Sequence, residues 1–89
     1  MKNQIESKVI QQAYYVICEK GEKSEKGHYF EGVTAYTDFD GYTLYLEAKG
    51  AVMTLGFHNT YHFDSETERE KTELLKKLYN IVKSYENAG

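Results

Sequence analysis

The sequence of 89 residues predicts a two-layer α+β fold with the element order α-β-β-β-(β)-α, in one domain spanning residues 1–89. Three observations predict this fold. Apolar residues recur at helical spacing near both ends of the chain, they alternate with polar residues over 33–57, and glycine-containing pairs interrupt that alternation twice. We therefore expect an antiparallel meander with both helices packed on one face.

The first helix is expected from about Gln4 to Lys20. Asn3 and Glu6 have the spacing of a capping box before it, and Gly21 is expected to end it. Placed at 100° steps, six apolar residues share one broad arc, which predicts an amphipathic helix: Ile5, Val9, Ile10, Ala13, Val16 and Ile17. The segment that follows, GEKSEKG over 21–27, is expected to be a polar connection.

The middle of the chain predicts three antiparallel strands. Their alternating runs are Val33–Phe39, Tyr42–Ala48 and Ala51–Phe57. Two-residue turns at Asp40-Gly41 and at Lys49-Gly50 would join neighbouring runs as hairpins. In the resulting register the apolar residues of all three runs lie on one face, Phe39 and Tyr42 among them.

The last third of the chain predicts a second amphipathic helix after an ambiguous segment. Residues 57–64 either extend the third strand or turn at Asn59-Thr60 into a short fourth strand. Ser65 and Glu68 offer a capping box for the helix. Six apolar residues then share one arc: Leu74, Leu75, Leu78, Ile81, Val82 and Tyr85.

Composition limits the function classes. Fourteen acidic and eleven basic residues leave a net charge of −3, which disfavours a dedicated nucleic-acid binder. The predicted topology is similar to that of the double-stranded-RNA-binding domain, so RNA binding stays as a second alternative. However, the last helix begins with the acidic stretch SETERE where that domain carries a basic cluster.

Cysteine usage and motifs point to a non-enzymatic cytoplasmic protein. A single cysteine excludes an intramolecular disulfide, and no stretch is as long and apolar as a membrane span. The amino-terminal stretch has no uninterrupted apolar core of signal-peptide length. The sequence contains no nucleophile elbow, no phosphate-binding loop and no HExxH motif, so neither an enzyme nor a cofactor is expected.

The stretch TDFDGYTLYLE resembles part of a calcium-binding loop. Asp38, Asp40, Gly41 and Glu47 match the third, fifth, sixth and twelfth positions of an EF-hand. The first position is Tyr36, however, and the residues after the glycine alternate like a strand instead of forming the required helix. We interpret the stretch as a hairpin turn.

Residues 57–64 provide the only candidates for a metal site. His58, His62 and Asp64 carry ligand groups, but in an extended segment the two imidazoles lie about 13 Å apart. A small-ligand or metal-binding module around 57–64 is therefore the alternative function, and no metal ligand is assigned.

The polar face of the predicted sheet supplies the leading functional hypothesis. In the expected register Tyr36 lies opposite Tyr45, which lies opposite Thr54, with Thr34 and Thr43 beside them. Tyrosine-rich surfaces are frequent in protein interfaces. We expect a binding or regulatory protein that acts through protein–protein contact at this face or through homodimerisation, with no membrane partner.

Three motifs resemble those of a known family: GEK at 21–23, DFDGYTLYLE at 38–47 and GFHNTYHFD at 56–64. The family comprises short bacterial proteins catalogued only as a domain of unknown function, and the likeness covers nearly the whole chain. The resemblance implies a stand-alone bacterial cytoplasmic protein and implies no activity, cofactor or catalytic residue.

Overall fold

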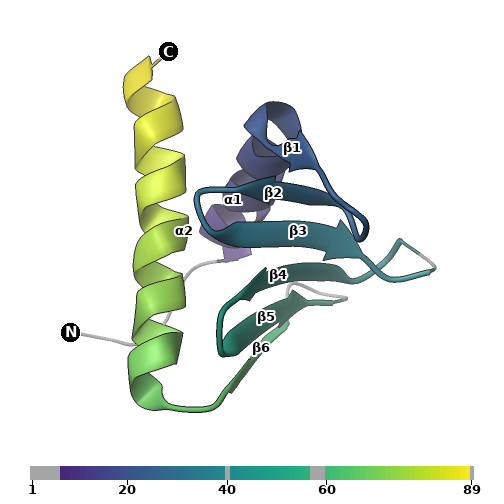
Figure 1. Ribbon diagram of the computed structural model, residues 1–89, viewed down its shortest axis with the longest axis vertical. Helices are drawn as coiled ribbons and strands as arrows, with labels where there is room; N and C mark the ends of the chain where they lie inside the picture. The colour runs from purple at the N-terminus through teal and green to yellow at the C-terminus, as the bar shows by residue number, and fades with distance from the viewer. Residues whose placement is uncertain (1–6, 40, 57–59, 89) are drawn as a thin grey trace.

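The computed structural model describes residues 7–39, 41–56 and 60–88 (Figure 1). Its elements are α1 (Ser7–Lys20), β1 (Glu22–Lys23), β2 (His28–Phe30), β3 (Val33–Thr37), β4 (Leu44–Ala48), β5 (Ala51–Leu55), β6 (Tyr61–Ser65) and α2 (Glu68–Ala88). The six strands form one antiparallel sheet in which each strand pairs with the next along the chain. The predicted α+β meander with two helices is confirmed.

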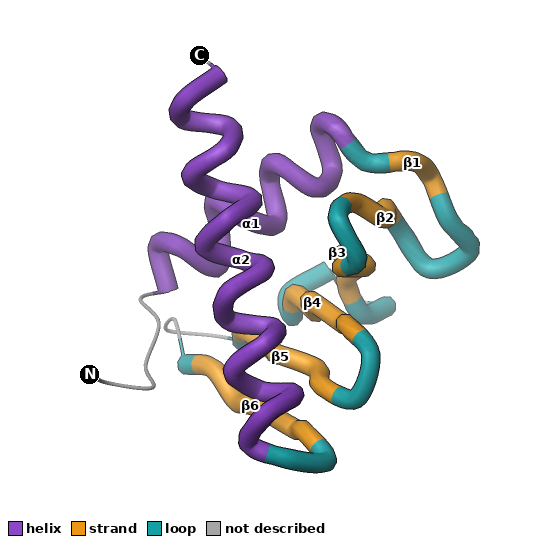
Figure 2. Tube along the Cα trace, turned by 60° about the vertical axis from the view of Figure 1, so that its left-hand side comes forward, coloured by secondary structure: helices purple, strands orange, loops and turns teal. Residues whose placement is uncertain are grey.

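Both helices cover the same face of the sheet. α1 lies against β2 and β3, α2 lies against β5 and β6, and the two helices pack against each other (Figure 2). Among the described residues, the side chains buried between the layers are all apolar: Ile10, Ala13, Val16, Ile17, Val33, Ala35, Leu46, Ala51, Met53, Leu55, Leu74, Leu75, Leu78, Ile81 and Val82. Every member of this core lies on the predicted apolar face of its element, while Val9 and Leu44 of those faces are only partly buried against it. Ile5, predicted on the same arc of the first helix, lies outside the described residues.

The sheet has two strands that the sequence did not predict. Glu22 and Lys23, expected in a polar connection, pair as β1 with Tyr29 and His28 of β2. A two-residue turn then joins β2 to β3, with φ of 53° at Glu31 and 84° at Gly32. Glutamate rarely adopts positive φ, so this turn lacks the Asn-Gly or Asp-Gly signal by which such hairpins are recognised.

The open question about residues 57–64 is decided in favour of a fourth strand of the predicted meander, β6. It runs antiparallel to β5, and the amide of Gly56 donates to the carbonyl oxygen of Thr60 at 2.8 Å. Asn59, which was expected to form the turn, lies outside the described residues.

The register of β3, β4 and β5 is the predicted one, but one of the two predicted turns is wrong. The ladder between β3 and β4 ends at Thr37 and Leu44, and the next backbone bond runs from the Asp38 amide to the Thr43 carbonyl. The Gly41 amide donates to both the carbonyl and the carboxylate of Asp38, at 3.0 and 2.9 Å. An Asp side chain that accepts from its own turn favours this wider loop over a two-residue turn.

That wider loop changes the environment of two aromatic residues. Phe39 and Tyr42 were predicted on the core face, but their side chains are 104% and 66% exposed. The second turn, at Lys49-Gly50, is confirmed: Ala48 pairs with Ala51, and Gly50 has φ of 77°.

The ends of the helices also correct the sequence analysis. α2 is capped by Thr67, whose hydroxyl accepts from the Glu70 amide at 3.2 Å and lies 3.2 Å from the Glu70 carboxylate. The cap is therefore Thr67, with Glu70 three residues on, and not Ser65 with Glu68, because β6 pairs through Ser65 and the helix begins only at Glu68. The predicted cap at Asn3 and Glu6 lies outside the described residues.

Tyr85, which was predicted on the buried arc of α2, is 37% exposed. It packs edge-on against Tyr15 of α1, with 6.1 Å between ring centroids. The two rings therefore extend the contact between the helices at its solvent-facing margin. Within the described residues no helix is long and apolar enough to cross a membrane.

Candidate functional site

The face of the sheet that the helices leave open carries the predicted interaction residues; we call it the outer face. The register forms one row from Tyr36 through Tyr45 and Thr54 to His62, and a neighbouring row of Thr34, Glu47, Val52 and Asp64. Thr43 precedes β4 on the same side of the chain as Tyr45. All five predicted interaction residues, Tyr36, Tyr45, Thr54, Thr43 and Thr34, are therefore brought together on this face.

Tyr36 and Tyr45 form an aromatic stack at the centre of the outer face. Their ring centroids lie 4.8 Å apart and their planes differ by 6°. Lys26 extends the arrangement, because its Nζ lies 5.2 Å from the centroid of the Tyr36 ring. Stacked pairs and cation–π contacts of this kind favour one orientation of each side chain. The two tyrosines thus form a fixed, half-buried platform.

Glu47 holds this platform in place. The Tyr36 hydroxyl donates to Glu47 Oε1 at 3.1 Å, and Lys26 Nζ lies 3.1 Å from the same oxygen. Burial raises the pKa of Tyr36 to about 12, and the hydrogen bond and negative charge of Glu47 act in the same direction. Tyr36 is therefore a neutral donor at physiological pH, and the three side chains form one connected polar group.

Gly27 makes this arrangement possible. A Cβ at this position would meet the Ala35 carbonyl oxygen and would lie 2.9 Å from the Tyr36 Cβ. Only glycine lets the backbone of the β1–β2 hairpin pass so close to β3 and carry Lys26 over the Tyr36 ring. Lys26 and Gly27 are the members of the site that were not predicted from the sequence, whereas Glu47 follows from the same register that places Tyr45 opposite Tyr36. The Lys-Gly pair at the end of GEKSEKG is the only sign of these two residues in the sequence. It predicts a contact with Tyr36 only once the hairpin between β1 and β2 is known.

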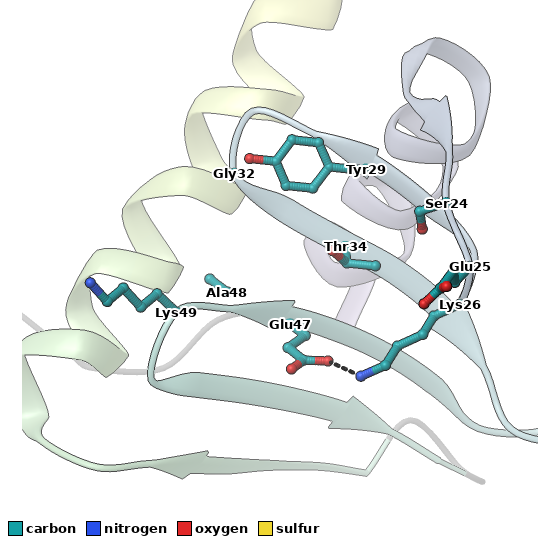
Figure 3. Close-up of a pocket in the computed structure, with 9 residues that line it drawn as sticks. All are labelled: Ser24, Glu25, Lys26, Tyr29, Gly32, Thr34, Glu47, Ala48 and Lys49. Atoms are coloured by element: carbon teal, nitrogen blue, oxygen red, sulfur yellow. Dashed lines mark hydrogen bonds and ion pairs between the residues drawn. The ribbon is translucent and has the colours of Figure 1, made fainter.

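A shallow groove of about 580 Å³ adjoins the platform (Figure 3). It is lined by Ser24, Glu25, Lys26, Tyr29, Gly32, Thr34, Glu47, Ala48 and Lys49. Figure 3 shows Tyr29, Thr34 and Glu47 on β2, β3 and β4, with Ser24, Glu25 and Lys26 on the connection between β1 and β2. Buried apolar walls of the kind that enclose small ligands are absent from this lining. The groove suits contact with a larger, polar surface.

A second groove, of about 710 Å³, continues from the first toward α2. The two share Tyr29, Gly32, Ala48 and Lys49, and α2 contributes Arg69, Glu70, Glu73 and Lys77 among others. Its charges are of both signs, so it offers no concentrated field for a single small ion.

The structure also places part of the candidate metal site. His62 and Asp64 lie on β6 with exposed side chains on the outer face, opposite Thr54 and Val52, while His58 lies outside the described residues. Among the described residues, no group of three or more His, Cys, Asp or Glu side chains could hold a metal ion. Glu47 lies within β4, which supports the interpretation of TDFDGYTLYLE as a hairpin.

A family model matches nearly the whole chain. The model, described as "Protein of unknown function (DUF3081)", matches residues 5–88, which confirms the resemblance to a domain of unknown function that the motifs indicated. Neither curated proteins nor solved structures gave a match.

Proposed function

The chain belongs to the DUF3081 family of proteins of unknown function, and we propose that it is a small, non-catalytic binding protein of the bacterial cytoplasm that docks a partner protein on its outer face. The Tyr36–Tyr45 stack, fixed by Glu47 and Lys26, is the observation that carries this proposal. The single cysteine fits a reducing compartment.

Pre-organisation favours a docking role for the stack. Binding normally costs free energy to immobilise interface side chains, and that cost is small for rings already held by a neighbour, a hydrogen bond and a cation. Tyrosine is also one of the residues on which interface energy concentrates, because it combines a large apolar ring with a hydroxyl. The threonines around the stack supply a polar rim without long flexible side chains.

The charges of this surface favour a partner with basic side chains. On the outer face and at its margin, carboxylates outnumber ammonium groups: Glu22, Glu25, Glu47 and Asp64 against Lys26 and Lys49. Lys26 is moreover engaged with Glu47. Phosphate backbones would be repelled here, so protein is favoured over RNA. An arginine of the partner could both stack on the tyrosine platform and pair with a carboxylate.

Affinity capture from a lysate of the encoding organism, followed by direct binding with the captured protein after purification, tests the proposal. The double variant Tyr36→Ala/Tyr45→Ala should weaken direct binding by at least about tenfold, as expected for truncation of central interface tyrosines. Tyr79→Ala is the matched control, because Tyr79 is 46% exposed on α2 in the helical layer. Equal binding by wild type and the double variant, or an equal loss in the control, would refute the proposal.

The same purified protein tests the alternative function. A titration with zinc, calcium and small metabolites is followed through backbone amide resonances. A saturable response centred on His62 and Asp64, with no effect of the tyrosine variants on any protein partner, would favour the small-ligand or metal module instead.

A further inference from the structure

The two edges of the sheet differ in how well they are protected against pairing with another strand. β1 has only two residues, Glu22 and Lys23, both exposed. β6 has five residues, YHFDS, without proline, glycine or lysine, and it pairs on one side with β5 (Figure 1). Natural sheets usually shorten or charge their edges, or interrupt them with proline. The β6 edge has the length and regularity of a strand that pairs.

The register with β5 shows which backbone groups of β6 face outward. The Glu66 amide donates to Gly50 and the Gly56 amide donates to Thr60, so residues at even positions from 60 to 66 direct their amides and carbonyls toward β5. By the same alternation, the amide and carbonyl of Phe63 point away from β5, toward the open side.

We propose that β6 pairs with β6 of a second copy, antiparallel and centred on Phe63, to form a two-fold symmetric dimer with a continuous sheet. This edge is separate from the Tyr36–Tyr45 stack, so the proposal stands independently of the proposed function. In a two-fold symmetric contact, if one residue of the first copy touches a second residue of the other copy, the reverse contact is also made. The sequence of the strand must therefore be complementary to itself.

The outer-face side chains of β6 provide that complementarity. With Phe63 at the two-fold axis, His62 of one copy lies opposite Asp64 of the other, and this happens twice. These are non-hydrogen-bonded pairs, in which opposing Cα atoms lie about 4.5 Å apart and side chains are closest. An imidazole N–H donates to a carboxylate whether or not the ring is charged.

The two neighbouring registers that also match outward-facing backbone groups are less favourable. A centre at His62 places the two imidazoles opposite each other, and a centre at Asp64 places two carboxylates opposite each other, which is destabilising. On the helix side, the centre at Phe63 brings together two half-exposed phenyl rings. In each copy the Nζ of Lys71 lies 4.8 Å from the centroid of the Phe63 ring. A centre at His62 would also bring aromatic rings together on the helix side, because Tyr61 would lie opposite Phe63. The outer-face pairs therefore decide the register.

Disulfide trapping tests the register directly. In a Cys18→Ala background, chains with His62→Cys and chains with Asp64→Cys are oxidised separately and as a mixture. The proposal predicts a cross-linked dimer in the mixture and little in either separate sample, because only opposite positions satisfy disulfide geometry. Efficient cross-linking of His62→Cys alone or of Asp64→Cys alone would overturn the register, and no cross-link in any sample would overturn the strand pairing.

Sedimentation equilibrium of the uncross-linked chain tests the complementarity. Wild type should dimerise, and His62→Asp should raise the dimer dissociation constant by about tenfold because it places two carboxylate pairs across the axis. The exchanged variant His62→Asp/Asp64→His restores the opposite pairing and should recover dimerisation. A monomeric wild type, or an exchanged variant as weak as the single one, would overturn the proposal.

Discussion

Replacing Tyr36 and Tyr45 by alanine, singly and together, should show that the two rings stabilise the fold through their contact. The losses in the free energy of unfolding from the two single variants should not add up to the loss in the double variant. The rings lie 4.8 Å apart and almost parallel, so either single change to alanine destroys the same contact. The hydrogen bond from Tyr36 to Glu47 and the contact with Lys26 depend on Tyr36 alone, and they cancel in a double-mutant cycle. The cycle therefore isolates the interaction between the two rings.

The expected coupling is about 1 kcal/mol. Aromatic pairs contribute about 0.5–1.5 kcal/mol beyond the area they bury. Tyr36→Ala additionally loses the hydrogen bond to the Glu47 carboxylate, about 1 kcal/mol at this partly exposed position. We thus expect Tyr36→Ala to destabilise more than Tyr45→Ala, and the two single losses together to exceed the loss in the double variant by about 1 kcal/mol.

Urea denaturation followed by circular dichroism measures the cycle. For a domain of this size a change of 1 kcal/mol moves the midpoint by about 1 M urea, well above experimental error. A parallel cycle between Tyr36 and Tyr79 provides the control, because Tyr79 lies on α2 in the other layer. A coupling of less than about 0.3 kcal/mol between Tyr36 and Tyr45, within ordinary additivity, would contradict the stacked geometry.

Three further predictions follow from the corrected local structure. Thr67→Ala should lower the free energy of unfolding by about 1 kcal/mol because it removes the cap of α2, whereas Ser65→Ala should cost less than half as much; equal losses would contradict the cap assignment. Glu31→Asn should raise the free energy of unfolding by about 0.5–1 kcal/mol, because asparagine tolerates the φ of 53° better; a loss in the same urea assay would contradict this. Burial raises the pKa of both Tyr14 and Tyr36 to about 12, with Cys18 and Glu47 respectively adding to it. A phenol whose pKa is higher in the folded than in the unfolded chain adds to the free energy of unfolding below pH 10. This contribution is lost as the pH rises from 10 to 12. Tyr36→Phe should therefore remove one late-ionising phenol from an ultraviolet titration, and an unchanged number would refute the assignment.

Much of the fold was predictable because hydrophobic periodicity determines it. The alternation over Val33 to Leu55 fixed which residues of β3, β4 and β5 face the helices, and a one-residue slip would have exposed the whole apolar set. The same register predicts Tyr36 opposite Tyr45, as the structure has them. The alternation of side chains along the strands therefore predicted both the buried core and the tyrosine pair at the centre of the candidate site.

The features that were missed depend on contacts distant in sequence. β1 and β2 are too short and polar to show periodicity, and the turn at Glu31 lacks the usual turn residues. Lys26 comes 21 residues before Glu47, its partner, so their ion pair exists only once the β1–β2 hairpin has folded against β3. The Asp38 carboxylate accepts from the Gly41 amide and so favours the wider loop. The alternation of apolar and polar residues gives no sign of such a side-chain hydrogen bond.

Site-specific photo-cross-linking in the encoding organism tests the central claim, protein docking on the outer face, most directly. A benzophenone side chain at Thr54 stands directly across from Tyr45 on the outer face, and the same group at Tyr79 probes the helical layer. We predict a discrete adduct with another protein from the Thr54 position, lost when Tyr36→Ala/Tyr45→Ala is introduced, and none from the Tyr79 position. An adduct from Tyr79 alone, or none from Thr54, would contradict the claim.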